Sequence, residues 1–217
     1  FVAEQMNLHQ DLLFAKNFFK AGVWKNEWEG AATANAAAKK FLKFDDSNCD
    51  PVGLFDGLIN EVRRVGRRKP NKLALGVDVF AKLKLNHFIM ERIKYTGTTA
   101  NPAIVTEQVL AQLFGVEKVV VLDSTYNDAP AGADENMKYI CDSKSALLCY
   151  TTDTPQIDEP SAGYIFAWDM LGDGKYTATS QFDGSPADHS EFIEGLIATD
   201  MKKTSDDLAV FLKNCVD

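Results

Sequence analysis

One helix is marked at both ends by the sequence, and it constrains the fold more than any other feature. Asp50 supplies an N-cap side chain, and Pro51 occupies the first helical turn, where the missing backbone N–H is not needed. Apolar residues then recur at helical spacing until Gly66: Val52, Phe55, Leu58, Ile59, Val62 and Val65. The sequence therefore predicts a helix over residues 51–66 with one buried face.

Around this helix the pattern alternates between helices and short strands. An amphipathic helix with a buried face is predicted over residues 2–20, followed by a long irregular excursion with a short helix near residues 35–42. Beyond residue 66 the predicted elements are a buried strand at 73–75, helices at 78–84 and 86–94, a helix that Thr106 caps and Gly115 ends, and a strand at 119–122.

The second half of the chain is mainly β. An exposed acidic loop is predicted over residues 123–135, and strands are predicted at 146–151, 163–168, 175–182 and 208–212. Helices concentrated early and strands late favour an α+β fold. A length of 217 residues allows one large domain or two interlocked ones.

Charge divides the chain into two unlike halves. Residues 1–100 carry a net charge of +5, whereas residues 101–217 carry −13. Such asymmetry indicates either self-association through complementary surfaces or a basic nucleic-acid face joined to an acidic remainder. The basic residues include a cluster at the end of the predicted 51–66 helix, made of Arg63, Arg64, Arg67, Arg68 and Lys69.

Two sets of residues are candidates for contacts between subunits. Three explanations are open for the first set, which consists of Arg63, Arg64, Arg67 and Arg68. The helix dipole alone favours cations at this position, or the arginines form a subunit contact, or they form a nucleic-acid surface. Trp24 and Trp28 are either interface anchors or part of the domain core.

Catalytic, cofactor and metal motifs are absent from the sequence. Neither a nucleophile elbow nor a phosphate-binding loop occurs. The tripeptide 188–190 has the residue types of a hydrolase triad, but neighbouring residues cannot form a relay, so a polar turn is expected. The aspartates of the acidic loop lack calcium-loop spacing, and His9 and His87 have no partner histidine nearby. We therefore predict no catalytic residue, no cofactor and no metal.

The four cysteines, Cys49, Cys141, Cys149 and Cys215, also lack zinc-ligand spacing and are expected to be buried free thiols. A disulfide between Cys141 and Cys149 is geometrically possible, but a reducing compartment argues against it. The sequence has no run of about 18 apolar residues and no apolar signal-peptide centre, so we expect a soluble, intracellular origin and no membrane partner.

Several segments, in order, resemble a block found in many tailed-bacteriophage major capsid proteins. They are E-V-R-R-V-G-R-R-K-P-N-K-L-A-L-G (61–76), V-F-A-K-L-K (79–84), E-R-I-K-Y-T (91–96), V-L-A-Q-L-F-G-V-E-K-V-V-V (109–121) and S-T-Y-N (124–127). Two later segments are similar to downstream parts of the same proteins: E-P-S-A-G-Y-I-F-A-W (159–168) and F-L-K-N-C-V (211–216). Each piece is short, and their ordered succession carries the resemblance.

The resemblance implies the Hong Kong 97-type capsid fold. Residues 1–96 would form a peripheral domain with its spine helix at 2–20, residues 97–172 an axial domain, and residues 173–217 strands that return to the sheets. The N-terminal arm and extended hairpin of that family have no counterpart before residue 2, which suggests a truncated or proteolysed form.

The implied function is that of a major capsid protein, a structural protein that self-assembles into the icosahedral shell around phage double-stranded DNA. Its partners would be other copies in hexameric and pentameric capsomers, portal, scaffold and decoration proteins, and DNA held without specificity. It would be assembled in the host cytoplasm and located in the virion. The alternatives are an encapsulin-like compartment shell, distinguished by an enzyme cargo, and a DNA-binding module, which the pI near 4.9 disfavours.

Overall fold

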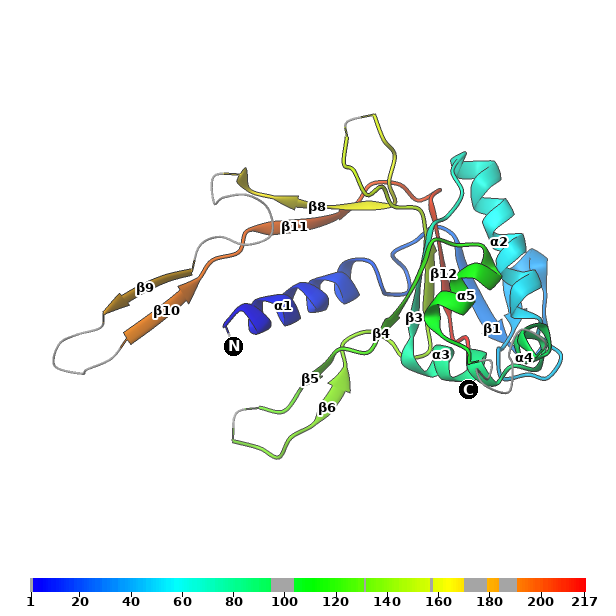
Figure 1. Cartoon of the computed structure of the whole chain (residues 1–217), viewed down its shortest axis with the longest axis horizontal. Coiled ribbons are helices and arrows are strands. Elements are labelled where there is room, and N and C mark those ends of the chain that lie inside the picture. Colours follow the sequence, from blue (N-terminus) through cyan, green and yellow to red (C-terminus); the bar gives the residue numbers. More distant parts are fainter. Residues whose placement is uncertain (1, 95–103, 131, 157, 170–178, 184–190) are drawn as a thin grey trace.

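The central element of the protein is a six-stranded mixed sheet with the strand order β2-β1-β12-β7-β3-β4 (Figure 1). The computed structural model describes residues 2–94, 104–130, 132–156, 158–169, 179–183 and 191–217. Pairs β1/β2, β1/β12 and β3/β4 are parallel, and β7 is antiparallel to both β12 and β3. The strands are β1 (Glu27–Ala31), β2 (Lys40–Leu42), β3 (Lys72–Gly76), β4 (Lys118–Leu122), β7 (Ala146–Cys149) and β12 (Ala209–Lys213).

Four helices form the first core with one face of this sheet. They are α2 (Pro51–Gly66), α3 (Val77–Leu85), α4 (His87–Ile93) and α5 (Glu107–Phe114). The predicted stripe of α2 is confirmed, since its apolar residues from Val52 to Val62 are buried. Val65 is the exception, because 52% of its surface is exposed. Every second residue of a strand contributes to this core, as Leu73 and Leu75 do in β3. This period of two is expected of a strand whose two faces have different surroundings.

Both ends of α2 agree with the predicted helix over residues 51–66. The Asp50 Oδ1 atom accepts a hydrogen bond from the Val52 N–H at 3.1 Å, as the predicted N-cap requires. Gly66 is the last residue of the helix, as predicted, and Arg67 follows it in the left-handed conformation, with φ of 58°. The glycine is needed for space, because a Cβ at residue 66 would lie 2.6 Å from the Asp207 carbonyl oxygen.

The opposite face of the sheet packs on a second core that includes Phe18, Phe19, Trp24, Leu147 and Phe211. The helix α1 (Val2–Asn17) leads into this core but has no fully buried residue itself. The predicted helix over 2–20 is thus confirmed for residues 2–17, whereas its fully buried face is wrong, since Leu13, Phe14 and Ala15 are only partly buried against the second core. Phe18 and Phe19, which fill the core, follow the helix, whereas α1 projects from the sheet beside β10 (Glu191–Gly195) and β11 (Thr199–Lys203) (Figure 1).

Three two-stranded ribbons project from the same side of the sheet as α1 (Figure 1). They pair β8 (Gly163–Ala167) with β11, β9 (Thr179–Asp183) with β10, and β5 (Thr125–Asn127) with β6 (Met137–Tyr139), all antiparallel. The β5–β6 ribbon contains the predicted acidic loop, which is thus partly a strand. β6, β10 and β11 were not predicted. The predicted strand at 175–182 falls partly outside the described residues.

Other sequence predictions compare well with the structure, with one clear exception. The predicted strands at 73–75, 119–122, 146–151, 163–168 and 208–212 correspond to β3, β4, β7, β8 and β12. Thr106 caps α5, and Gly115 ends it in a left-handed conformation. The excursion after residue 20 is more regular than predicted, because it contains β1 and β2. In place of a helix at 35–42 it has a three-residue 3-10 turn, η1 (Ala36–Ala38).

The central sheet draws strands from all three predicted domain ranges. Strands β1, β2 and β3 come from residues 1–96, β4 and β7 from 97–172, and β12 from 173–217. The two parallel neighbours β3 and β4 lie on opposite sides of the predicted boundary between residues 96 and 97. The mixed helix and sheet content agrees with the α+β prediction, and the peripheral and axial domains stay predictions.

Candidate assembly surfaces

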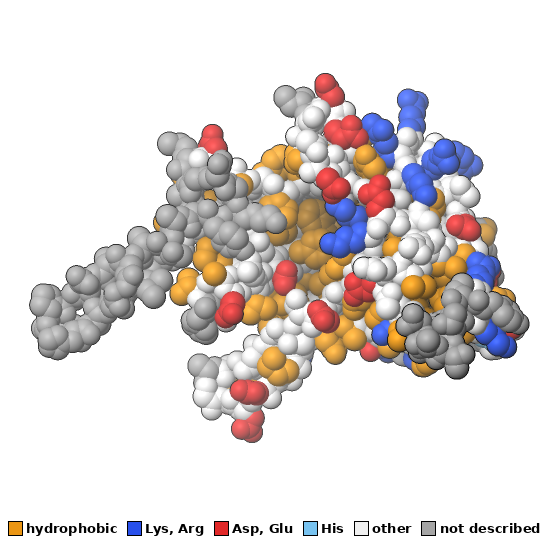
Figure 2. Space-filling model, viewed as in Figure 1, with side chains coloured by type: hydrophobic (Ala, Val, Ile, Leu, Met, Phe, Trp, Pro, Cys, Tyr) orange, Lys and Arg blue, Asp and Glu red, His pale blue; other side chains and the backbone are white. Residues whose placement is uncertain are grey.

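Five cations surround the C-terminal end of α2, and we call them the basic cap: Arg63, Arg64, Arg67, Arg68 and Lys69. All five are exposed, and Figure 2 shows Lys and Arg side chains gathered over this end of the helix. The orphan carbonyl groups of a helix C-terminus favour positive charge at this position. In the described part of the chain, only Arg68 of this group forms an ion pair, with Glu159 at 3.2 Å. The other described residues therefore leave most of the charge of the cap without an ion-pair partner.

The ribbon made of β5, β6 and their connection carries a cluster of the opposite charge, and we call it the acidic hairpin (residues 123–139). Its carboxylates Asp123, Asp128, Asp134 and Glu135 are exposed, and Lys138 pairs with Asp128 at 2.5 Å. No residue of β6 is buried, and Met137 and Tyr139 are 56% and 46% exposed. The hairpin points away from the body of the protein, at the opposite end from the basic cap (Figures 1 and 2).

The two candidate tryptophans occupy different positions. Trp24 is only 4% exposed; its Nε1–H donates to the Phe18 carbonyl oxygen at 2.7 Å, and its ring stacks on Phe18. Trp24 thus lies in the second core and leaves little surface for a partner. Trp28 is partly buried against the first core. Its Nε1 atom is buried and has no hydrogen-bond partner among the described residues.

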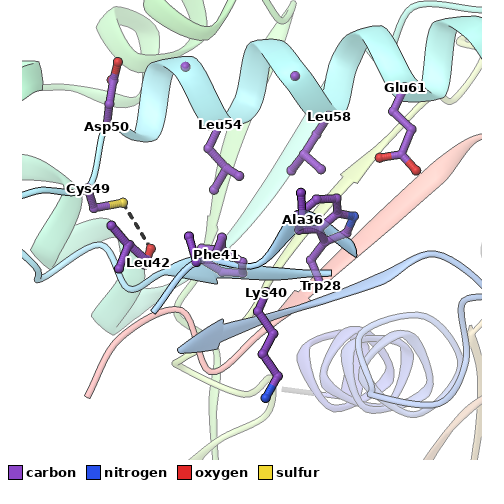
Figure 3. Close-up of a pocket in the computed structure, with 13 residues that line it drawn as sticks. Trp28, Ala36, Lys40, Phe41, Leu42, Cys49, Asp50, Leu54, Leu58 and Glu61 are labelled. Atoms are coloured by element: carbon purple, nitrogen blue, oxygen red, sulfur yellow. Dashed lines mark hydrogen bonds between the residues drawn. The ribbon is translucent and has the colours of Figure 1, made fainter. Parts of the chain in front are cut away.

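Trp28 lies in an open groove of about 420 Å³ between β2 and α2 (Figure 3). The groove is mainly apolar, with Lys40, Asp50 and Glu61 as its charged lining residues. Its one thiol, Cys49, donates to the Leu42 carbonyl oxygen at 3.1 Å, and burial raises the pKa of Cys49 to about 12. A protonated thiol is a poor nucleophile, and no histidine lines the groove to activate it. The groove therefore lacks the pair of groups that nucleophilic catalysis requires.

A second cavity, of about 290 Å³, lies between the end of α1, β8 and the face of the sheet. Phe14, Phe18 and Leu147 are among its mostly apolar lining residues. Burial raises the pKa of its one thiol, Cys149, to about 12, so this cysteine is also protonated near neutral pH. The cavity resembles an incompletely filled core more than a site with converging polar groups.

The predicted absence of a disulfide agrees with the structure, since all four cysteines are free. Cys149 is partly exposed, whereas the other three are buried as expected. Within the described ranges, no three His, Cys, Asp or Glu side chains are arranged to hold a metal ion. No helix in these ranges is long and apolar enough to cross a membrane. The tripeptide 188–190 lies outside the described residues.

Known proteins resemble this chain in sequence over part of its length and in fold over nearly all of it. A stretch of 86 residues is 31% identical to the major capsid protein of Burkholderia phage BcepMu. This stretch makes up 40% of this chain and 27% of the phage protein. The crystal structure of a phage-related protein from Bordetella bronchiseptica matches with a TM-score of 0.74 and 17% identity. That match covers 99% of this chain and 65% of the Bordetella protein.

A weaker structural likeness, with a TM-score of 0.45 and 13% identity, relates 97% of this chain to 62% of a chain in the capsid of cyanophage P-SCSP1u. No protein-family model matches the chain. The chain thus spans less than two thirds of the length of these relatives. The resemblance to phage major capsid proteins is confirmed by the sequence match, and the Bordetella structure confirms the fold of a phage-related protein.

Proposed function

We propose that this chain is part of a phage major capsid protein, a structural protein and not an enzyme, whose copies associate into the capsid shell. The observation that carries the proposal is the 86-residue sequence match to a protein of that name. Two features of the structure are consistent with it. Its described cavities have no converging catalytic groups, and its projecting ribbons expose apolar side chains that an isolated subunit leaves uncovered.

The finer part of the proposal is a Hong Kong 97-type subunit with α1 as its spine helix. We assign α1 and the β8–β11 and β9–β10 ribbons to the peripheral domain, and the six-stranded sheet with its four helices to the axial domain. Two observations support this division. The helix α1 lies against β10 and β11, and domain boundaries at residues 96 and 172 would divide the six-stranded sheet between domains. Hexameric and pentameric capsomers, a DNA-filled shell and portal or scaffold partners belong to the same proposal.

Sedimentation of the complete protein tests the shell function. A subunit that closes into a symmetric shell should sediment as a narrow population of very large particles, because each copy uses the same contacts and closure limits the size. A broad distribution without an upper limit would indicate open aggregation instead. A complete protein that stays a monomer or a dimer at every concentration would contradict the proposal.

DNA binding by the basic cap is expected to be negligible at physiological salt. The cap is only one patch on a chain of net charge −8, and phosphate contacts weaken steeply as salt rises. The measurement is a fluorescence titration of labelled duplex DNA with the purified chain, with Arg67→Ala/Arg68→Ala as the comparison. Tight binding that this double substitution abolishes would instead support the DNA-binding alternative.

A further inference from the structure

We propose that the acidic hairpin of one copy docks on the basic cap of the next copy in a head-to-tail contact. The proposal rests on the shell function and names surfaces and a partner for it. Both surfaces belong to this chain, so the partner is a second copy. The contact would join residues 123–139 of one subunit to the C-terminal end of α2 in its neighbour.

Exposed apolar side chains on both surfaces are the first support for the contact. A two-stranded hairpin is marginally stable alone in water and needs packing on one face. Met137 and Tyr139 point to the same face of the hairpin, since they are two residues apart in β6, and the described residues leave both about half exposed. On the cap, Val65 is 52% exposed within a helix stripe that is otherwise buried. Each surface thus offers an apolar centre surrounded by charges, as at many protein interfaces.

Charge complementarity is the second support. Residues 123–139 contain four carboxylates and one lysine, so their net charge is −3, and the basic cap contains five cations. Within the described part of the chain, one ion pair neutralises charge in each surface, Lys138 with Asp128 and Arg68 with Glu159. Complementary potentials guide two proteins into register and penalise contacts between like charges. Hairpin-to-hairpin and cap-to-cap contacts are therefore disfavoured.

The positions of the two surfaces determine the type of assembly. The hairpin and the cap lie at opposite ends of the protein, so they cannot meet within one copy (Figures 1 and 2). Two different patches that join successive copies make a heterologous interface, and such an interface produces closed rings when its rotation closes. The geometry thus fits a ring-like capsomer better than an isolated two-fold dimer.

Charge reversal on each surface, separately and in mixture, tests the contact. The cap variant is Arg64→Glu/Arg67→Glu, and the hairpin variant is Asp134→Lys/Glu135→Lys. Sedimentation equilibrium of the 217-residue chain at low salt measures self-association. We expect each variant alone to associate at least roughly tenfold more weakly than the unmodified chain, because the net charge of the cap falls from +5 to +1 in one variant and that of the hairpin rises from −3 to +1 in the other, which removes most of the attraction. An equimolar mixture should recover pairwise association, since the unmodified hairpin of the cap variant can dock on the unmodified cap of the hairpin variant.

The matched control is Lys20→Glu/Lys82→Glu, which changes the net charge as the cap variant does but at exposed lysines outside both surfaces. It should associate as the unmodified chain does, and circular dichroism should show all variants folded. Unchanged association in both reversal variants, failure of the mixture to recover, or a chain that is monomeric at every concentration would overturn the contact. Unchanged association in the variants would leave shell formation itself standing, because the sedimentation of the complete protein tests that separately.

Discussion

Phe55→Ala is expected to lower the free energy of unfolding by about 3–5 kcal/mol, the range for truncating a buried aromatic side chain. Phe55 is completely buried, and its ring centroid lies 4.5 Å from that of Phe114 and 5.9 Å from that of Phe44. These rings join α2, α5 and the segment after β2, so their contacts connect three parts of the first core. Chemical denaturation followed by circular dichroism measures the change.

Leu12→Ala is the matched comparison for that substitution. Leu12 lies on α1 and is 37% exposed, so its truncation should cost less than about 1 kcal/mol, close to the range of surface substitutions. The sequence pattern predicted a buried face for this helix and hence a much larger loss. Equal losses for Phe55→Ala and Leu12→Ala would show that α1 packs on a core that the structure does not contain.

Gly30→Ala is also expected to lower the free energy of unfolding, because the added methyl group would collide with a neighbouring backbone. A Cβ at residue 30 would lie 2.0 Å from the Asn214 carbonyl oxygen and 2.9 Å from its carbonyl carbon. Both atoms belong to backbone that follows β12, the parallel neighbour of β1, so neither can move without separating the two strands. We expect a loss of at least about 1–3 kcal/mol, the usual cost of overpacking a core, and a lower thermal midpoint.

Gly57→Ala provides the control, because a Cβ at residue 57 would meet no atom within 4 Å. Gly57 lies inside α2, where alanine is favoured over glycine by about 0.5–1 kcal/mol, so this substitution should stabilise the chain. Thermal unfolding of both variants under one set of conditions gives the comparison. If both variants lost stability to the same extent, the close approach of β1 to residue 214 would be wrong.

Local sequence signals predicted the helices and strands that do not depend on contacts with distant parts of the chain. Asp50, Pro51 and a stripe of apolar residues define α2, and Thr106 and Gly115 define α5, through contacts within a few residues. The strands β1 and β2 carry no comparable pattern. β1 has the sequence E-W-E-G-A, and it is a strand because β12 and β2 pair with its two edges. Only the fold brings residues 211–213 next to residues 27–29.

The same limit explains why a buried face was predicted incorrectly for α1. A periodic apolar stripe shows that a helix can pack on something, but it does not show what is available. The segment 2–17 projects beside a narrow ribbon and so lacks a broad surface on which to bury Leu12. The buried side chains are instead those of Phe18 and Phe19, which follow the helix at the point where the chain reaches the sheet.

The candidate surfaces were partly predictable. The basic cap is contiguous in sequence, so its cations could be grouped before its position was known. The sequence could not show that Val65 is exposed among those cations, that Trp24 is buried while Trp28 lines a groove, or that the acidic hairpin projects at the opposite end. These facts depend on tertiary contacts, which neither spacing nor composition records.

Electron microscopy of the complete protein, purified as it assembles, tests the central claim most directly. A phage capsid subunit should form hollow particles of uniform size with icosahedral symmetry, and the fold of the described residues should fit their shell density without rearrangement of the central sheet. Only monomers, filaments or amorphous aggregates, or closed particles whose shell density cannot accommodate this fold, would contradict the claim.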